Sequence, residues 1–380
     1  FLNIGDVTPP NDCNPGLCPA GSWSMFQGGV TRPGSSEAVM DPGAALLWTT
    51  KLAGDVRSAV ISPTDSDFPW PRGLVYVKAG RYVYALNPDS GTTVWSFDLG
   101  VAGAATGQGA PAVTDYKNSG TPGDPVDDEM YLYVGSGDGY FYKLNAFDGR
   151  MDTNQACKSA KLGTNLSKAS PVIGRDGTVY LVDDAAIDHL IAVDPVGCKQ
   201  KWVVNLGAGA GTSSPAYWDR GDGNNANDRI FFGADKLYSV TVWGGIDWAV
   251  SLKVAADSGT APTTPLVVNN TVYVVNSVGD LYWVQFPGDP ATATAMRVSN
   301  VPPGAHGSGS LAAYFDIVLS EYYLYWGHLS VLYQYETISP DPPDDPSRTI
   351  SRPLPGASFS DSTPVTTNPA ANQGLVFIGS

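Results

Sequence analysis

The residues best suited to chemistry form one polar run between Asp219 and Asp228. In this run, Asp-Arg-Gly-Asp-Gly-Asn-Asn-Ala-Asn-Asp, side-chain oxygens alternate with glycines at Asp219, Asp222, Asn224 and Asp228. Oxygen ligands at alternating positions, with glycine for the sharp turn, are what a flexible Ca²⁺ loop requires. The run is not an EF-hand, because no glutamate closes it. Asn, Asp and Gly also dominate solvated turns, so the run predicts either a calcium site or a plain hairpin turn.

The three histidines offer no second centre of this kind. His189, His306 and His328 lie apart in the sequence, and none accompanies a nucleophile elbow or an HExxH pair. No P-loop and no dinucleotide fingerprint is visible either. Catalytic triads assemble from distant positions, so enzyme activity stays an open question. We predict no catalytic residue and no organic cofactor, with calcium as the one candidate ion.

The four cysteines show no CxxC spacing and no clustering with histidine, which argues against zinc and thioredoxin-like chemistry. Disulfides are the better use, and they imply an oxidising compartment. We expect Cys13 to pair with Cys18 around a small loop. Cys157 and Cys198 sit on equivalent outer parts of neighbouring repeats, and we expect them to pair. The alternative is four unpaired buried thiols.

Composition narrows the partners and the location. The formal net charge of -15 argues against nucleic acid, because a phosphate backbone needs a basic stripe. An acidic surface attracts cations or basic partners. No apolar run approaches the ~20 residues that cross a bilayer. Glycosylation sequons begin at Asn165 and Asn269. We expect an extracellular, cell-surface or periplasmic protein without a membrane span.

A repeated phrase of short strands must position these residues. It appears as GLVYVKAGRYVYALNPDSGTTVWSFDL from Gly73 and returns from Tyr131 and Gly177, with weaker copies from Arg229, Thr271 and Tyr322. Such copies recur at roughly 45 to 60 residues, the range in which one repeat is one propeller blade. Each repeat predicts four strands, A to D. Strand A opens at a proline, a residue tolerated where a strand begins.

Counting the strands predicts an all-β, seven-bladed propeller of four-stranded blades. Seven B strands are expected, at Leu74, Tyr131, Thr178, Arg229, Thr271, Tyr322 and Leu375. Residues 46–52 match the tryptophan-bearing D strands, so we expect this N-terminal strand to close the last blade and leave no long exposed edge. We predict an N-terminal extension with a small disulfide loop over 1–40 and a single propeller domain over 41–380.

The last blade lacks a C strand after residues 375–379. Three explanations stay open: the chain continues, residues 23–30 fold into the slot, or another subunit supplies the strand by β-augmentation. The third would make the molecule a building block, with proteins or further copies of itself binding through the open blade edge.

The triplet of VYV or LYVG, DG-x-x-YAL-N/D and TG-x-x-x-W resembles the repeat of the PQQ-like propeller family, which includes BamB-like proteins and quinoprotein dehydrogenases. The resemblance implies that the D-strand tryptophans dock between blades, namely Trp48, Trp95, Trp202 and Trp248. Its quinone enzymes carry adjacent cysteines, which this chain lacks. The stretch from Asp219 to Gly233 is similar to loops of PilY1-type pilus-tip propellers.

These observations predict a non-catalytic extracellular or cell-surface propeller that acts as a protein-binding or assembly scaffold. Two alternatives remain: a quinoprotein-type oxidoreductase, and a surface protein associated with a pilus or filament.

Overall fold

The computed structural model describes seventeen stretches of the chain: 47–56, 58–62, 73–100, 109–114, 129–151, 157–207, 213–252, 263–268, 270–276, 280–285, 295–297, 311–316, 321–328, 331–337, 351–358, 370–372 and 375–377. From residue 295 onward, it describes the side chains of Ala295, Leu311 and Leu324. The predictions on the extension over 1–40, on Cys13 and Cys18 and on Asn269 lie outside the described residues.

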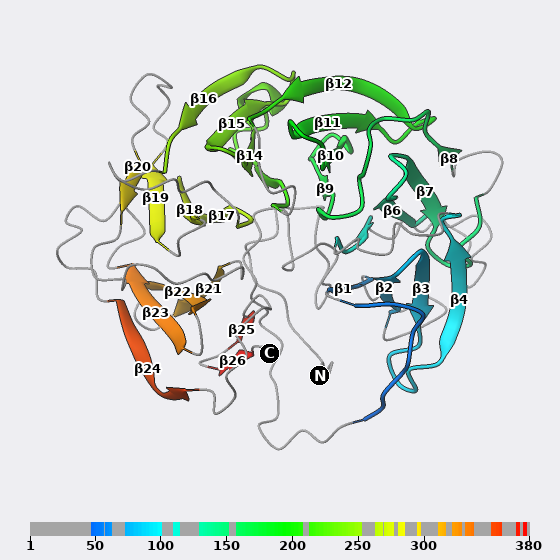
Figure 1. The fold of residues 1–380 in the computed structure, drawn as a ribbon, viewed down its shortest axis with the longest axis horizontal. Helices are drawn as coiled ribbons and strands as arrows, with labels where there is room; N and C mark the ends of the chain where they lie inside the picture. Colours follow the sequence, from blue (N-terminus) through cyan, green and yellow to red (C-terminus); the bar gives the residue numbers. More distant parts are fainter. Residues whose placement is uncertain are drawn as a thin grey trace. The chain divides into compact units, whose positions relative to one another are not determined.

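The described residues form two compact units, one ending at Asn205 and the other beginning at Leu206. In each unit, antiparallel strands follow one another within a sheet in chain order (Figure 1). The first unit holds three four-stranded sheets: β1 (Ala59–Ile61), β2 (Val75–Ala79), β3 (Tyr82–Leu86) and β4 (Thr93–Asp98); β5 (Ala112–Val113), β6 (Tyr131–Gly135), β7 (Phe141–Asn145) and β8 (Cys157–Lys158); β9 (Val172–Ile173), β10 (Val179–Asp183), β11 (His189–Asp194) and β12 (Lys199–Asn205).

The second unit repeats the design. Its strands are β13 (Ala216–Trp218), β14 (Arg229–Gly233), β15 (Leu237–Thr241) and β16 (Ile246–Val250); β17 (Leu266–Val268), β18 (Thr271–Val275), β19 (Leu281–Gln285) and β20 (Ala295–Arg297); β21 (Ala312–Asp316), β22 (Glu321–His328), β23 (Val331–Thr337) and β24 (Ser351–Ser358); and the pair β25 (Ala370–Asn372) and β26 (Leu375–Phe377). A short 3₁₀ turn spans Asn225–Asn227.

The prediction of the B strands is confirmed. Each of the seven expected positions falls on a strand or directly before one, from β2 to β26. These segments are rich in β-branched and aromatic residues, which suit a pleated, buried surface. The all-β architecture of four-stranded sheets is therefore that of a propeller, whereas the number of blades and the closure of the ring stay predictions. The predicted N-terminal D strand over 46–52 is not confirmed, because residues 47–52 are described and carry no strand.

In three of the sheets, the core contains an aromatic pair at one cross-strand position. An aromatic residue of strand B packs against a tryptophan on strand D, two strands away. The ring centroids are 5.9 Å apart for Tyr76 and Trp95 and 5.7 Å for Tyr180 and Trp202. Phe231 and Trp248 repeat the contact at 5.8 Å. Aromatic pairs at such distances add to the stability gained from burial alone.

The innermost strands are joined by a repeated hydroxyl bond. In two places, the residue before the proline that leads into an A strand donates its N–H to the hydroxyl of the residue before the corresponding proline of the next sheet. The N of Ala110 lies 2.8 Å from Ser170 Oγ in the first unit, and the N of Ser214 lies 3.0 Å from Thr264 Oγ1 in the second. Small hydroxyl-bearing residues here thus link neighbouring sheets.

Candidate functional site

The polar run of residues 219–228 forms the loop between β13 and β14. Its carboxylate and amide oxygens accept hydrogen bonds from nearby backbone N–H groups: Asp219 Oδ1 from Gly221 at 2.7 Å, Asp222 Oδ1 from Asn224 at 2.8 Å, and Asn224 Oδ1 from Ala226 at 3.1 Å. These are Asx turns, in which the side chain replaces a backbone partner.

Asp228 differs from the other three predicted calcium ligands because it is fully buried. Its Oδ2 accepts the hydroxyl proton of Tyr217, and its Oδ1 accepts the N–H of Arg220 at 3.1 Å. Its own N–H donates to Asn225 O at 3.1 Å, which closes the 3₁₀ turn. Asp228 therefore anchors the loop to β13, while Asp222 and Asn224 are exposed. Within the described residues, no group of three or more His, Cys, Asp or Glu side chains is arranged to hold a metal ion.

Asp183 and His189 form a second polar cluster, where β10 turns into β11. His189 Nδ1 lies 3.2 Å from Asp183 Oδ2. The other carboxylate oxygen accepts the N–H groups of Thr164 and Asn165 at 2.8 and 2.7 Å. The Oδ1 of Asn165, the described sequon residue, in turn accepts from Ser167 N and Oγ. The buried Asp183 thereby fixes the segment that leads into β9, while His189 stays partly exposed.

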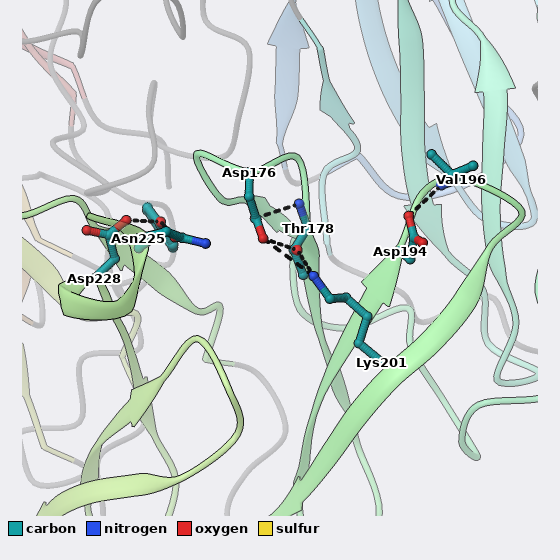
Figure 2. Close-up of polar contacts among 8 residues, drawn as sticks. Asp176, Thr178, Asp194, Val196, Lys201, Asn225 and Asp228 are labelled. Carbon is teal, nitrogen blue, oxygen red and sulfur yellow. Dashed lines mark hydrogen bonds and ion pairs between the residues drawn. The ribbon is translucent and has the colours of Figure 1, made fainter. Parts of the chain in front are cut away.

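A similar polar arrangement ties the edge of this sheet to its inner hairpin. Asp176 accepts from the N–H and the hydroxyl of Thr178 at 3.0 and 2.8 Å, and Lys201 Nζ donates to the same hydroxyl at 2.8 Å (Figure 2). Burial by itself raises the pKa of Asp176, but these hydrogen bonds and the charge of Lys201 together lower it. The carboxylate therefore stays ionised, and it holds β12 through Lys201.

Lys78 is a buried cation at the end of β2, 4% exposed. Its Nζ donates to the carbonyl oxygens of Gly135 and Ser167 at 3.0 and 3.1 Å. Burial lowers the pKa of Lys78 to about 7. Since Gly135 ends β6 and Ser167 precedes β9, one side chain joins all three sheets of the first unit.

Outer strands β12 and β16 occupy the same position in successive sheets but present different surfaces. β12 carries Lys199 and Lys201 on its exposed side, and charged edge residues of this kind discourage pairing with another strand. β16 carries Ile246, 48% exposed, and the turn before it carries Trp243, 68% exposed. In the described part of the chain, β16 pairs with β15 alone. The strand β16 thus carries exposed apolar side chains and no lysine, and its one charged residue, Asp247, is ion-paired with Arg229 at 2.8 Å.

The four predicted docking tryptophans are all described. Trp48 Nε1 donates to Pro88 O at 2.8 Å, and Trp95 Nε1 donates to Ala146 O, in the next sheet, at 3.1 Å. Trp202 and Trp248 pack on the aromatic residue of their own sheets. The predicted disulfide between Cys157 and Cys198 is confirmed, and it joins β8 to the turn before β12. A disulfide is typical of an oxidising compartment.

A family model described as outer membrane protein assembly factor BamB matches residues 79–285, which is more than half of the chain. This chain belongs to the BamB-like family of PQQ-type propellers. A search of curated proteins found no match. No helix in the described part of the chain combines the length and apolar character needed to cross a membrane.

Solved structures extend the likeness of this BamB-like chain over most of its length. BamB from Moraxella catarrhalis aligns with a TM-score of 0.53 at 13% identity, over 99% of this chain and 93% of that one. Quinohemoprotein alcohol dehydrogenase from Comamonas testosteroni aligns with a TM-score of 0.56 at 13% identity, over 94% and 70%. At these identities the likeness shows the fold alone. The PilY1 C-terminal domain from Pseudomonas aeruginosa aligns with a TM-score of 0.43 at 14% identity, over 57% of this chain and 59% of that one. This similarity is too weak to support a shared fold.

The sequence analysis missed Lys78, the Asp183–His189 pair and the apolar edge of β16. Lys78 interrupts the otherwise apolar strand VYVKA, and that interruption was a usable signal. Trp243 precedes two glycines in a turn, a place where a large apolar side chain has no core to join. Nothing in the sequence marks Asp183 and His189 as a pair. The N–H groups that hold Asp183 belong to Thr164 and Asn165, in the segment before β9.

Proposed function

We propose that this BamB-like chain is a non-catalytic propeller outside the cytoplasm that binds an extended segment of another protein along β16. The observation that carries the proposal is the edge of β16, where Ile246 and the neighbouring Trp243 are exposed and no lysine blocks pairing. A strand added to such an edge gains main-chain hydrogen bonds, and pockets for alternate side chains provide specificity. Exposed tryptophan is also a frequent binding hot spot.

The family supports a binding role, since its model is described as an outer membrane assembly factor. The disulfide supports an extracellular, cell-surface or periplasmic location. The net charge of -15 favours a partner segment with basic residues flanking its apolar ones. We propose seven blades closed by residues 46–52, with Trp48, bonded to Pro88 in the first sheet, as the support for that closure.

Photo-crosslinking in a host that secretes the protein tests the proposal. A photoreactive amino acid replaces Ile246 in β16, and a matched control places it at Val203 in β12, which is 46% exposed. The proposal expects an adduct with one identified protein from position 246, lost on Trp243→Ala, and no such adduct from position 203. An adduct with a second copy of the chain supports an assembly scaffold instead of a separate partner. Equal adducts from both positions, or none, would overturn it.

A quinoprotein-type oxidoreductase is the second candidate, favoured by the fold shared with quinohemoprotein alcohol dehydrogenase. The cysteines of this chain stand at 13, 18, 157 and 198, so the adjacent pair expected of its quinone enzymes is missing. Visible absorbance of the purified protein and dye reduction with an alcohol or a sugar, after loading with pyrroloquinoline quinone, separate the two candidates. A scaffold shows neither signal.

Calcium binding at Asp219, Asp222, Asn224 and Asp228 stays a proposal, as does a pilus- or filament-associated role. The loop oxygens already accept backbone hydrogen bonds, so an ion would use their remaining lone pairs or displace these bonds. Titration calorimetry with Ca²⁺ tests the site, with Asp222→Asn as the variant that weakens binding. The absence of binding heat in the unaltered protein would remove the calcium proposal. A pilus- or filament-associated role predicts that micrographs of native material show filaments that contain this protein.

A further inference from the structure

One indole contact occurs twice in the first unit. Trp48 and Trp95 each donate the indole N–H to a carbonyl just beyond a C strand: Trp48 to Pro88 O, which follows Asn87 directly after β3, and Trp95 to Ala146 O, which follows Asn145 at the end of β7. Each indole also covers the glycine four positions after that asparagine. A Cβ added at Gly91 or Gly149 would lie 2.4 Å from the indole Cε3, so only glycine fits beneath the ring.

Cys157 occupies the tryptophan position of the second sheet. The register pairs Trp95 with Ala85, which stands two residues before Asn87. It pairs Cys157 with Lys143, which stands two residues before Asn145. The sheet β5–β8 therefore has a cysteine on its D strand where its neighbours have tryptophan.

Cys198 occupies the glycine position of the third sheet. It follows Asp194, the last residue of β11, by four positions, just as Gly91 and Gly149 follow their asparagines. Its φ of 54° matches the 67° and 72° of those glycines, and among the described residues it is the one non-glycine with positive φ. Cys157 Sγ also lies 3.8 Å from Pro195 O, the carbonyl that an indole would reach.

We propose that the Cys157–Cys198 disulfide is a covalent replacement for the contact in which a tryptophan indole covers a glycine, which we call the tryptophan–glycine dock. In this proposal the disulfide holds the sheet β5–β8 against the sheet β9–β12. Both positions of the contact differ from those of the other sheets: one cysteine stands in place of the tryptophan, and the other in place of the glycine. The outer strand β8 has two residues, Cys157 and Lys158, and it pairs with β7 at two positions. Its attachment depends on the covalent bond more than on its ladder.

This replacement makes one of the joints between sheets conditional on an oxidising environment. Dithiothreitol supplies two electrons and two protons, which convert the S–S bond into two thiols while the reagent closes to its own cyclic disulfide. The thiols are too small to cover the turn as an indole does. The joints at Trp48 and Trp95 contain no sulfur and stay intact under the same conditions.

Placing tryptophan and glycine at this joint tests the proposal. The double variant Cys157→Trp, Cys198→Gly is compared with Cys157→Ala, Cys198→Gly, which has the same relaxed backbone but no indole. We expect dithiothreitol to lower the melting temperature of the unaltered protein by roughly 5–15 °C. With Cys13 and Cys18 replaced by serine in every protein compared, the tryptophan–glycine variant should be insensitive to dithiothreitol and should melt at least about 3 °C above the alanine–glycine variant.

Hydrogen exchange keeps the test decisive if the tryptophan variant folds poorly. Reduction of the unaltered protein should lower the protection of peptides covering 157–159 and 194–199, and it should leave those covering 87–95 unchanged. The proposal is overturned if reduction leaves the protection of both regions unchanged, or lowers it equally throughout the unit. It is also overturned if the folded tryptophan–glycine variant is no more stable than the alanine–glycine control.

Discussion

The two units of this propeller share one sheet design but differ in what holds neighbouring sheets together and in what they expose. The first unit joins its sheets with a buried cation at Lys78, an indole at Trp95 and a disulfide at Cys157. The second unit is described with hydroxyl bonds between its inner strands, such as Thr264 to Ser214, and with an exposed aromatic turn at Trp243. The first unit also exposes large apolar side chains, such as Val196 at 76%, so the proposed contact edge at β16 depends on the position of its side chains and not on exposure alone.

The largest expected effect is the loss of an indole joint. Trp95→Ala removes an 8%-exposed side chain that bridges two sheets, and such truncations cost about 3–5 kcal/mol of the free energy of unfolding. The exposed Trp243→Ala should cost under about 0.5 kcal/mol. Chemical denaturation measures both. A similar loss of unfolding free energy in the two variants would contradict the assignment of Trp95 to a joint between sheets and of Trp243 to an exposed contact surface.

The buried cation predicts a pH dependence specific to the first unit. Folding lowers the pKa of Lys78 from 10.5 to about 7, so between these values the unfolded chain binds more protons than the folded one. The free energy of unfolding therefore rises as pH increases above about 7, and it is insensitive to this group below that pH. Denaturation at pH 7, 8 and 9 should show the rise in the unaltered protein and a flatter profile in Lys78→Met. A Lys78→Met profile of unchanged slope would contradict the assignment.

The hydroxyl bond between inner strands is common to both units, so its loss should not discriminate between them. Ser170→Ala and Thr264→Val each leave one buried N–H without its acceptor, that of Ala110 or of Ser214, at a cost of about 1–3 kcal/mol. Denaturation midpoints should shift to a similar extent in the two variants. A clear inequality would mean that the inner strands of the two units are not built alike.

The smallest effect on stability should accompany a large effect on binding. Ile246→Lys places a charge on the apolar edge of β16, and Val203→Lys makes the matched change on β12. Both should alter the free energy of unfolding by less than about 0.5 kcal/mol. Affinity for the cross-linked partner should fall at least about tenfold for Ile246→Lys and stay unchanged for Val203→Lys. Equal losses of affinity would count against a specific edge.

Much of the scaffold could be predicted because its signals are local and periodic. The B strands recur as short aliphatic and aromatic runs, and the cysteine pair falls on neighbouring repeats, so each was readable from spacing. The functional edge could not be predicted in this way. The exposure of Trp243 and Ile246 depends on how a turn projects from a folded sheet. The role of Lys78 depends on carbonyl groups 57 and 89 residues away.

The most direct test of the account is a density map of the native particle, fine enough to trace the strands around β16. The account predicts an additional strand, from a partner protein or a second copy of the chain, paired along Ile246–Val250, while β12 carries none. A particle in which the edge of β16 faces solvent, with partner density at β12 or at neither edge, would contradict it.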